Sequence, residues 1–130
     1  MGKFSRHSHK AKVSSIRRGD IYLVSFDPTV GHEIKKTRPA LIIQNDIGNQ
    51  YSPLTIVAAV TSKVSGTSYP VEVAVEPSRA NGLSVRSAIL LNQIRTIARQ
   101  RLIKRLGAAD AGTMQQVNQA LKISLRLIEI

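Results

Sequence analysis

The sequence predicts a small, mainly β domain with a helix at its C-terminal end. Five short stretches are rich in aliphatic and β-branched residues, and turn-forming residues separate them, as in strands joined by tight turns. After residue 110 the apolar residues instead recur every three or four positions, which is the period of a helix. The 130 residues suffice for one domain. We therefore expect a strongly bent sheet or small barrel with a helix covering one side.

The first three strands are expected before residue 62. Residues 19–27 combine aliphatic and aromatic residues and end at a turn-forming Asp-Pro pair. After a polar loop, Pro39 opens a second strand over residues 40–45, since a strand tolerates proline at its first position but not inside. Turn residues within 48–53 then precede a third strand over residues 54–61.

The fourth and fifth strands are expected over residues 69–76 and 88–97. In the fourth, Val71, Val73 and Val75 alternate with other residues, which is typical of a half-buried strand. Residues 77–82 between them read as a turn or short helix. A short helix is expected over residues 99–102, and Asp110 is suited to cap a longer one. One stripe of this last helix is apolar, and we interpret it as packing: it consists of Met114, Val117, Leu121, Leu125 and Ile128.

The charge of the chain is strongly positive. Nineteen lysine and arginine residues stand against eight acids, a net charge of +11. The first 18 residues hold six of these basic residues and no acid. We predict a disordered basic arm over residues 1–16 and a single domain over residues 17–130. Such a charge attracts polyanions, including nucleic acids and acidic protein segments.

Composition excludes several classes of protein. With no cysteine, the chain has neither disulfides nor thiolate metal sites, which fits a reducing cytoplasm. Its longest apolar stretch has five residues, far below the roughly 20 that a membrane-spanning helix needs. The sequence also lacks a phosphate-binding glycine loop, a nucleophile elbow and a helical metal-binding histidine pair.

The remaining reactive side chains suit RNA cleavage. RNA carries its own nucleophile, the 2′-hydroxyl, so an enzyme need only align it, stabilise charge on the phosphorus and move protons. Arginine suits the second task because its planar fork meets two phosphate oxygens. Such groups are concentrated in loop 31–39, which includes Arg38, and Thr61 ends the third strand. Taken alone, each of these residues has a structural explanation as a surface charge or strand end.

Several segments, in one order, resemble the MazF/PemK family of toxins over residues 17–130. The matching segments are Gly19-Asp20-Ile21-Tyr22-Leu23, Asp27-Pro28, Gly31-His32-Glu33, the stretch from Arg38-Pro39 to Asn45-Asp46, Thr61-Ser62-Lys63 and Leu91-Asn92-Gln93-Ile94-Arg95-Thr96-Ile97. The resemblance implies an SH3-like β-barrel with a covering C-terminal helix, assembled as a homodimer. It also implies a metal-independent endoribonuclease that needs no cofactor, cleaves single-stranded RNA at short motifs in the cytoplasm, and is inhibited by an acidic antitoxin.

The resemblance also assigns roles to residues. Arg38 and Thr61 match the family's catalytic arginine and threonine, His32 the proton-transfer histidine of its PemK-like branch, and Glu33 the acid of the first loop. Residues expected to contact RNA are Lys35, Lys36, Thr37, Ser62, Lys63, Asn92, Gln93 and Arg95. Loops 47–53, 63–68 and 77–86 are expected to set which bases are read.

Two departures from the family pattern affect the chemistry. Residues 34–36 replace a glutamine-containing part of the first loop, and add two lysines that favour phosphate contact or alter base selection. Asn92 and Leu90 replace an aspartate and an arginine of the PemK-like branch. An amide can hydrogen-bond but cannot take up a proton. Acid–base duty then rests with Arg38, His32 or Glu33.

Two other functions remain open from the sequence. The same barrel occurs in CcdB-type toxins, which poison DNA gyrase and have no nuclease activity. The paired Arg38 and Thr61 argue against that function, which does not need them. The second alternative is a non-catalytic module that binds RNA or an antitoxin, an interpretation favoured by Asn92.

Overall fold

A computed structural model describes residues 15–26, 37–64 and 69–129. Predicted residues His32, Glu33, Lys35 and Lys36, and nearly all of the basic arm, lie outside these ranges. The elements in chain order are β1 (Asp20–Ser25), β2 (Thr37–Ile42), α1 (Asp46–Tyr51), β3 (Leu54–Thr61), β4 (Glu72–Val75), β5 (Ser87–Ala98), the 3₁₀ turn η3 (Arg99–Arg101), β6 (Leu102–Ala108) and α2 (Ala111–Ser124).

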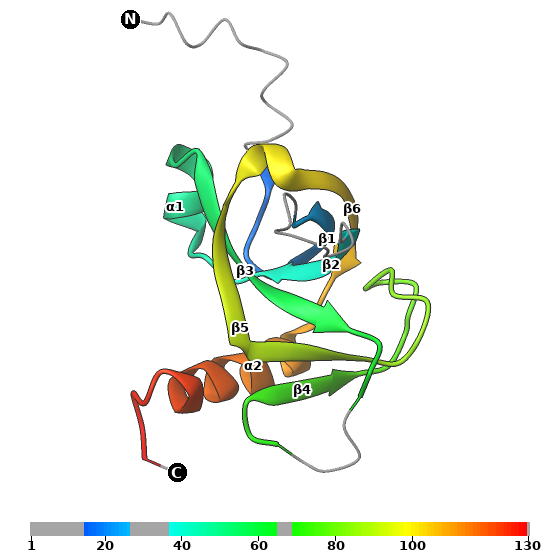
Figure 1. Ribbon diagram of the computed structural model, residues 1–130, viewed down its shortest axis with the longest axis vertical. Helices are drawn as coiled ribbons and strands as arrows, with labels where there is room; N and C mark the ends of the chain where they lie inside the picture. Colours follow the sequence, from blue (N-terminus) through cyan, green and yellow to red (C-terminus); the bar gives the residue numbers. More distant parts are fainter. Residues whose placement is uncertain (1–14, 27–36, 65–68, 130) are drawn as a thin grey trace, which may run out of the picture.

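The six strands form one antiparallel sheet that curls into a small barrel (Figure 1). Their order is β4-β5-β3-β2-β1-β6, so the last strand returns to pair with the first. The 12-residue β5 is long enough to bend and follow the curvature. Its register against β3 jumps between Ala58, which pairs with Ile94, and Ala59, which pairs with Leu90. This bulge in β5 allows the sheet to turn a corner.

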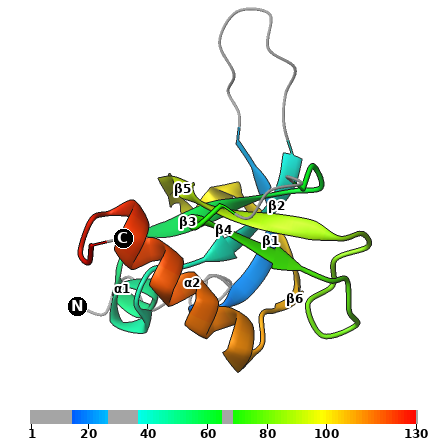
Figure 2. The ribbon, with the colours of Figure 1, turned by 90° about the horizontal axis from the view of Figure 1, so that it is seen from below.

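Apolar side chains pack in two clusters on opposite faces of the sheet. The larger cluster includes Ile21, Leu41 and Ile89, and α2 contributes Val117 and Ala120 to it. Figure 2 shows α2 lying along one side of the sheet. The second cluster consists of Val24, Ala40, Ile42, Val57 and Ile97. The predicted mainly β barrel with a covering C-terminal helix is therefore confirmed.

Packing begins slightly earlier than the predicted domain boundary. Ile16, which we assigned to the arm, is 3% exposed. The chain is fixed just after it, where the carboxylate of Asp20 accepts a hydrogen bond from the Arg17 backbone amide at 2.9 Å and pairs with Arg105 at 3.2 Å. Ile16 therefore packs with the residues that follow it. Among the described residues, no helix has the length and apolar character required to span a bilayer.

Several predicted elements differ from those in the structure. Pro39 lies inside β2 rather than at its start, and this is tolerated because pairing with β3 begins only at Ala40. The turn expected around Gly48 is the helix α1. The expected five strands are six, because β6 follows the confirmed 3₁₀ turn. The last helix ends at Ser124, so Leu125, 52% exposed, does not extend its apolar stripe.

A buried amide holds α1 against the sheet. The side-chain oxygen of Asn49, fully buried, accepts hydrogen bonds from Thr55 at 2.8 Å and Gln44 at 3.0 Å. Its side-chain nitrogen donates to the Gln44 carbonyl and to the Asp46 carboxylate. The pKa of Asp46 is lowered chiefly by the hydrogen bond that it accepts from the Arg18 backbone amide. These bonds satisfy polar groups that would otherwise be costly to bury.

Asp110 caps α2, as the sequence predicted. Its carboxylate accepts a hydrogen bond from the backbone amide of Thr113 at 2.8 Å, one of the amides that a helix start leaves without a partner. This bond lowers the pKa of Asp110. The cap is therefore present at neutral pH and is lost as the pH falls through that lowered pKa.

The variant Asn49→Ala tests the buried amide. It leaves the Thr55 hydroxyl and the Gln44 amide without their shared acceptor, so we expect the free energy of unfolding to fall by about 3 kcal/mol. Urea denaturation measures this change. The matched control Asn118→Ala removes one exposed hydrogen bond to Arg18 and is expected to cost under about 1 kcal/mol. Equal losses in the two variants would contradict the assignment.

Candidate functional site

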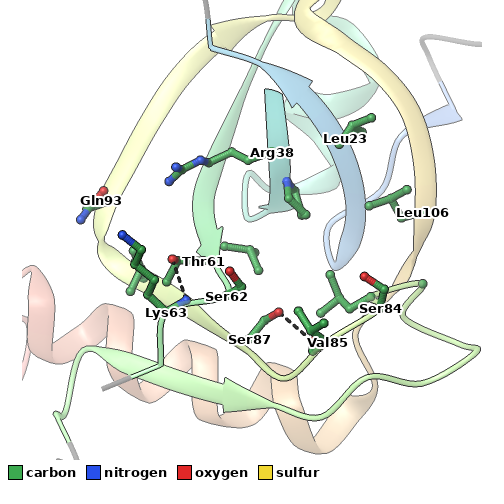
Figure 3. A pocket seen from close by; sticks show the side chains of 15 residues that line it. Leu23, Arg38, Thr61, Ser62, Lys63, Ser84, Val85, Ser87, Gln93 and Leu106 are labelled. Atoms are coloured by element: carbon green, nitrogen blue, oxygen red, sulfur yellow. Dashed lines mark hydrogen bonds between the residues drawn. The ribbon is translucent and has the colours of Figure 1, made fainter. Parts of the chain in front are cut away.

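A cleft of about 600 Å³ opens where the barrel meets the loop before β5 (Figure 3). It receives side chains from β1, β2, β3, β5 and β6 as well as from this loop. The lining residues are Leu23, Arg38, Pro39, Val60, Thr61, Ser62, Lys63, Gly82, Leu83, Ser84, Val85, Ser87, Leu90, Gln93 and Leu106. The cleft therefore contains five of the residues that the sequence predicted: Arg38, Thr61, Ser62, Lys63 and Gln93.

Strand register places Arg38 and Thr61 together. Ala40 of β2 pairs with Ala59 of β3, and two further residues along each antiparallel strand lead to Arg38 and Thr61. Because side chains alternate across a strand, both residues lie on the same face as the Ala40–Ala59 pair. Arg38 is half-buried and also pairs with Val24 of β1, so its backbone is fixed by the sheet.

The hydroxyl of Thr61 has a defined orientation. Its oxygen accepts a hydrogen bond from the backbone amide of Lys63 at 3.1 Å, where the chain leaves β3. A hydroxyl has one proton to donate and two lone pairs. With one lone pair engaged by Lys63, the Thr61 proton can be directed to an oxygen atom of a ligand in the cleft.

The charge of the cleft favours an anion. Arg38 and Lys63 are its charged lining residues, and no aspartate or glutamate is among the described residues that line it. Figure 3 shows the side chain of Arg38 reaching across the cleft toward the side where Gln93, Thr61 and Lys63 lie. A phosphate in this space would meet a planar cation, an ammonium group, a hydroxyl and an amide, all of which donate hydrogen bonds.

Other predicted residues lie outside the cleft lining. Asn92 follows Leu91 in the β5 bulge and is exposed. Thr37 is exposed opposite Ser25, and Arg95 is exposed on β5 opposite Val57. The structure thus separates the predicted set into residues that share the cleft and residues on the surface around it. Within the described ranges, no group of three or more histidine, cysteine or acidic residues is placed to hold a metal ion.

The sequence did not identify individual residues of the opposite wall. Ser84, Val85 and Leu83 come from the 77–86 loop, which was expected to shape the site, whereas Leu106 comes from the strand that was not predicted. Ser87 is buried, and its hydroxyl donates to the Val85 carbonyl at 2.9 Å. Small polar residues in a loop carry no chemical pattern, so only the fold reveals them.

Close backbone contact fixes this wall against β6. Gly82 has a φ of +72°, a value favoured by glycine, and a Cβ atom there would collide with the Leu106 carbonyl. A Cβ at Gly107 would likewise collide with the Ala80 carbonyl. The amide of Ala108 donates to that same carbonyl at 2.9 Å. The loop can therefore lie against the strand only because both positions lack side chains.

The chain is similar to one family of known proteins over most of its length. Residues 17–125 match the family described as PemK-like, MazF-like toxin of type II toxin–antitoxin system. The chain is 45% identical over 114 residues to Endoribonuclease EndoA of Bacillus subtilis, covering 88% of this chain and 97% of that protein. It is also 45% identical over 112 residues to Endoribonuclease MazF of Staphylococcus saprophyticus, covering 86% and 92%.

The fold of the chain is also similar to that of a solved structure. The MazE–MazF complex of Deinococcus radiodurans (Form-II) matches with a TM-score of 0.70 and 30% sequence identity. The match covers 88% of this chain and 97% of that one.

The variant Gly82→Ala tests the wall of the cleft. The added methyl group meets the Leu106 carbonyl in a backbone conformation that alanine rarely adopts, so we expect a loss of about 2 kcal/mol or more in unfolding free energy. Thermal denaturation measures it. Gly112→Ala is the control, since its nearest neighbour is an Asp110 oxygen at 3.7 Å. In the first turn of α2 this change should stabilise the protein by up to about 1 kcal/mol. A stable Gly82→Ala protein would show that the contact is not close.

Proposed function

The chain belongs to the PemK-like, MazF-like toxin family of type II toxin–antitoxin systems, and on this premise we propose that it is an endoribonuclease toxin. Its substrate is single-stranded RNA, which is cut at a short sequence motif. The observation that carries the proposal is the cleft in which Arg38 and Thr61 lie beside Lys63, without an acidic side chain among its described lining residues. The named endoribonucleases among its relatives support the same reaction.

The reaction that suits this site is transesterification within the RNA. The 2′-oxygen attacks the adjacent phosphorus and forms a new oxygen–phosphorus bond, while the bond from phosphorus to the 5′-oxygen breaks. The 2′-hydroxyl loses its proton to a base, and the departing 5′-oxygen gains one. The products are a 2′,3′-cyclic phosphate, or the 3′-phosphate derived from it, and a 5′-hydroxyl. No metal-bound water is needed, because the substrate supplies the nucleophile.

Arg38 is proposed to stabilise the charge that develops on the phosphate. Its guanidinium donates to two oxygens at once, and the sheet holds its backbone before substrate arrives, which limits reorganisation during the reaction. Thr61 is proposed to donate its hydroxyl proton to one of the same oxygens. Donors fixed where charge appears are among the largest contributions to catalysis.

His32 and Glu33 are proposed to move protons. Both stand in the segment between β1 and β2, which rejoins the described chain at Thr37, next to Arg38. Asn92 cannot take this role because an amide does not titrate. An imidazole, whose unperturbed pKa is about 6.5, suits either removal or delivery of a proton at neutral pH.

RNA is proposed to extend beyond the cleft in both directions. Ser62, Lys63 and Gln93 would lie beside the reacting phosphate. The remaining candidates (Lys35, Lys36, Thr37, Asn92 and Arg95) would contact neighbouring nucleotides. Lysine and arginine recognise phosphates regardless of sequence. Base selection requires unpaired bases whose edges reach the protein.

The proposed partners follow from charge and family. An acidic antitoxin segment would compete with RNA for the basic surface of a chain whose net charge is +11. A MazE–MazF complex is among the solved structures that this chain resembles. We propose that the toxin acts as a homodimer, and that it works in the cytoplasm, where its RNA substrate occurs.

Cleavage assays with purified protein test Arg38 and Thr61. Single-stranded RNA is incubated with protein in excess EDTA, and the initial rates are compared. We expect discrete cleavage by the wild type, a loss of at least about 10³-fold in Arg38→Ala, and a loss of about 10²-fold in Thr61→Val. Arg38→Lys should recover part of the rate, because it restores the charge without the fork.

The control for these variants is Arg126→Ala, at a position that follows α2 and is 80% exposed in its side chain. It lowers the net charge equally and should cleave at the wild-type rate. Cleavage by Arg38→Ala at the rate of this control would contradict the proposed site. RNA that is bound tightly but left intact by the wild type would contradict the proposed activity.

The pH dependence of His32→Ala tests proton transfer. If the imidazole is the base, the wild-type rate falls as the pH drops below its pKa, and the variant loses this acidic limb. If it is the acid, the variant loses the alkaline limb instead. A uniform decrease at every pH would show that His32 positions the substrate and does not transfer a proton.

A further inference from the structure

An arginine lies over an aromatic ring beside the cleft. Phe26 directly follows β1, and Arg95 lies on β5, 69 residues later in the chain. The guanidinium carbon of Arg95 lies 5.1 Å from the centre of the Phe26 ring. This distance is within the range of a cation–π contact. Arg95 is among the residues proposed to contact RNA, whereas Phe26 has no role in the proposed function.

Core residues hold the Phe26 ring on one side, whereas the Arg95 side chain is exposed to solvent. Phe26 packs against the second apolar cluster, which includes Val24, Val57 and Ile97. Arg95 itself is exposed. The barrel core, the phenyl ring and the guanidinium therefore form successive layers, and the outer layer is a flat cation that faces solvent. An arginine that served only as a solubilising charge would not need a ring beneath it.

The pair lies on the same face as the proposed catalytic residues. Val24 pairs with Arg38, and Phe26 is two residues beyond Val24, so its side chain points to the same side. Arg95 pairs with Val57, which shares a face of β3 with Thr61. Gln93, two residues before Arg95, lines the cleft itself. A nucleotide next to the scissile phosphate can therefore reach the pair.

We propose, on the basis of the endoribonuclease function above, that Arg95 supported by Phe26 forms a stacking platform for one unpaired RNA base next to the cleavage site. Guanidinium planes and aromatic rings both stack on bases, and recognition of single-stranded RNA relies on such contacts. Arg95 provides the contact surface. Phe26 is a positioning residue that holds the planar guanidinium over the core.

The plainer role for Arg95 is a contact to a phosphate. Lysine distinguishes the two roles, because it keeps the charge and loses the planar group. A phosphate contact keeps its charge in Arg95→Lys, although it loses the planar fork, and it quenches no flanking base in either protein. A stacked base instead loses its platform, and its quenching is lost with it. Phe26→Leu keeps an apolar side chain over the core and removes only the ring that orients Arg95.

The experiment uses a fluorescent base as the probe. The cleavage position is first mapped on single-stranded RNA in EDTA. Oligonucleotides of the same sequence then carry 2-aminopurine at each position around the cut, and a single 2′-deoxy sugar at the cut removes the nucleophile. Stacking quenches 2-aminopurine, so the wild-type protein should quench one flanking position more strongly than the others. Arg126→Lys, remote in sequence and equally conservative, is the control.

We expect Arg95→Lys to lose that quenching and to weaken RNA binding about tenfold, the scale of a lost base stack. In cleavage assays, KM should rise more than kcat falls. Phe26→Leu should show the same changes to a smaller extent, and Arg126→Lys neither.

Quenching that persists in Arg95→Lys, or that is equal at all positions in the wild type, would overturn the platform while leaving the endoribonuclease function intact. The absence of cleavage by the wild type would instead overturn the proposed function, so the two failures are distinguishable.

Discussion

The pairing of β1, β2 and β3 is the constraint on which the site depends. Ala40 and Ala59 are paired across β2 and β3, and Val24 is paired with Arg38 across β1 and β2. A shift of one residue in this register would turn Arg38 to the opposite face. Such a shift would also move Leu41 and Ile42, which are fully buried and pack in different clusters, each into the other cluster, so it would disrupt the packing on both faces of the sheet. Core packing therefore fixes the orientation of the proposed catalytic arginine.

The curvature of the sheet adds the second part of the site. The bulge in β5 lets one strand contribute Leu90 and Gln93 to the cleft and then Arg95 to the surface over Phe26. On the other side, Gly82 lets its loop lie against β6 and close the cleft. One wall of the cleft is thus positioned by backbone contacts between the Gly82 loop and β6. The hydrogen-bond donors Arg38 and Thr61 are positioned by the register of β2 and β3.

The sequence predicted the five strands that are rich in aliphatic and β-branched residues, and β3 has the expected bounds of Leu54–Thr61. It did not predict β6, because Lys104 and Arg105 interrupt its apolar residues and few of its side chains are buried. It read α1 as a turn because the hydrogen bonds of Asn49 that hold this helix come from residues outside it. Such contacts are invisible to a local pattern.

The sequence also predicted only part of the candidate site. Arg38 and Thr61 were proposed from their chemistry and family resemblance, and the strand pairing brings them into one cleft. The layering of Arg95 on Phe26 joins β1 to β5 across the barrel, so no spacing in the sequence indicates it. His32 and Glu33 lie outside the described residues, and their roles rest on the family alone.

We propose that the 2′-oxygen of the RNA attacks a phosphate held by Arg38. Mass spectrometry of the cleavage products tests this proposal most directly. Incubation of one short RNA in EDTA should yield a fragment ending in a 2′,3′-cyclic phosphate or 3′-phosphate and a fragment beginning with a 5′-hydroxyl. The same RNA with a single 2′-deoxy sugar at the cut should remain intact. A 5′-phosphate on the products, or cleavage of the deoxy-substituted strand, would contradict it.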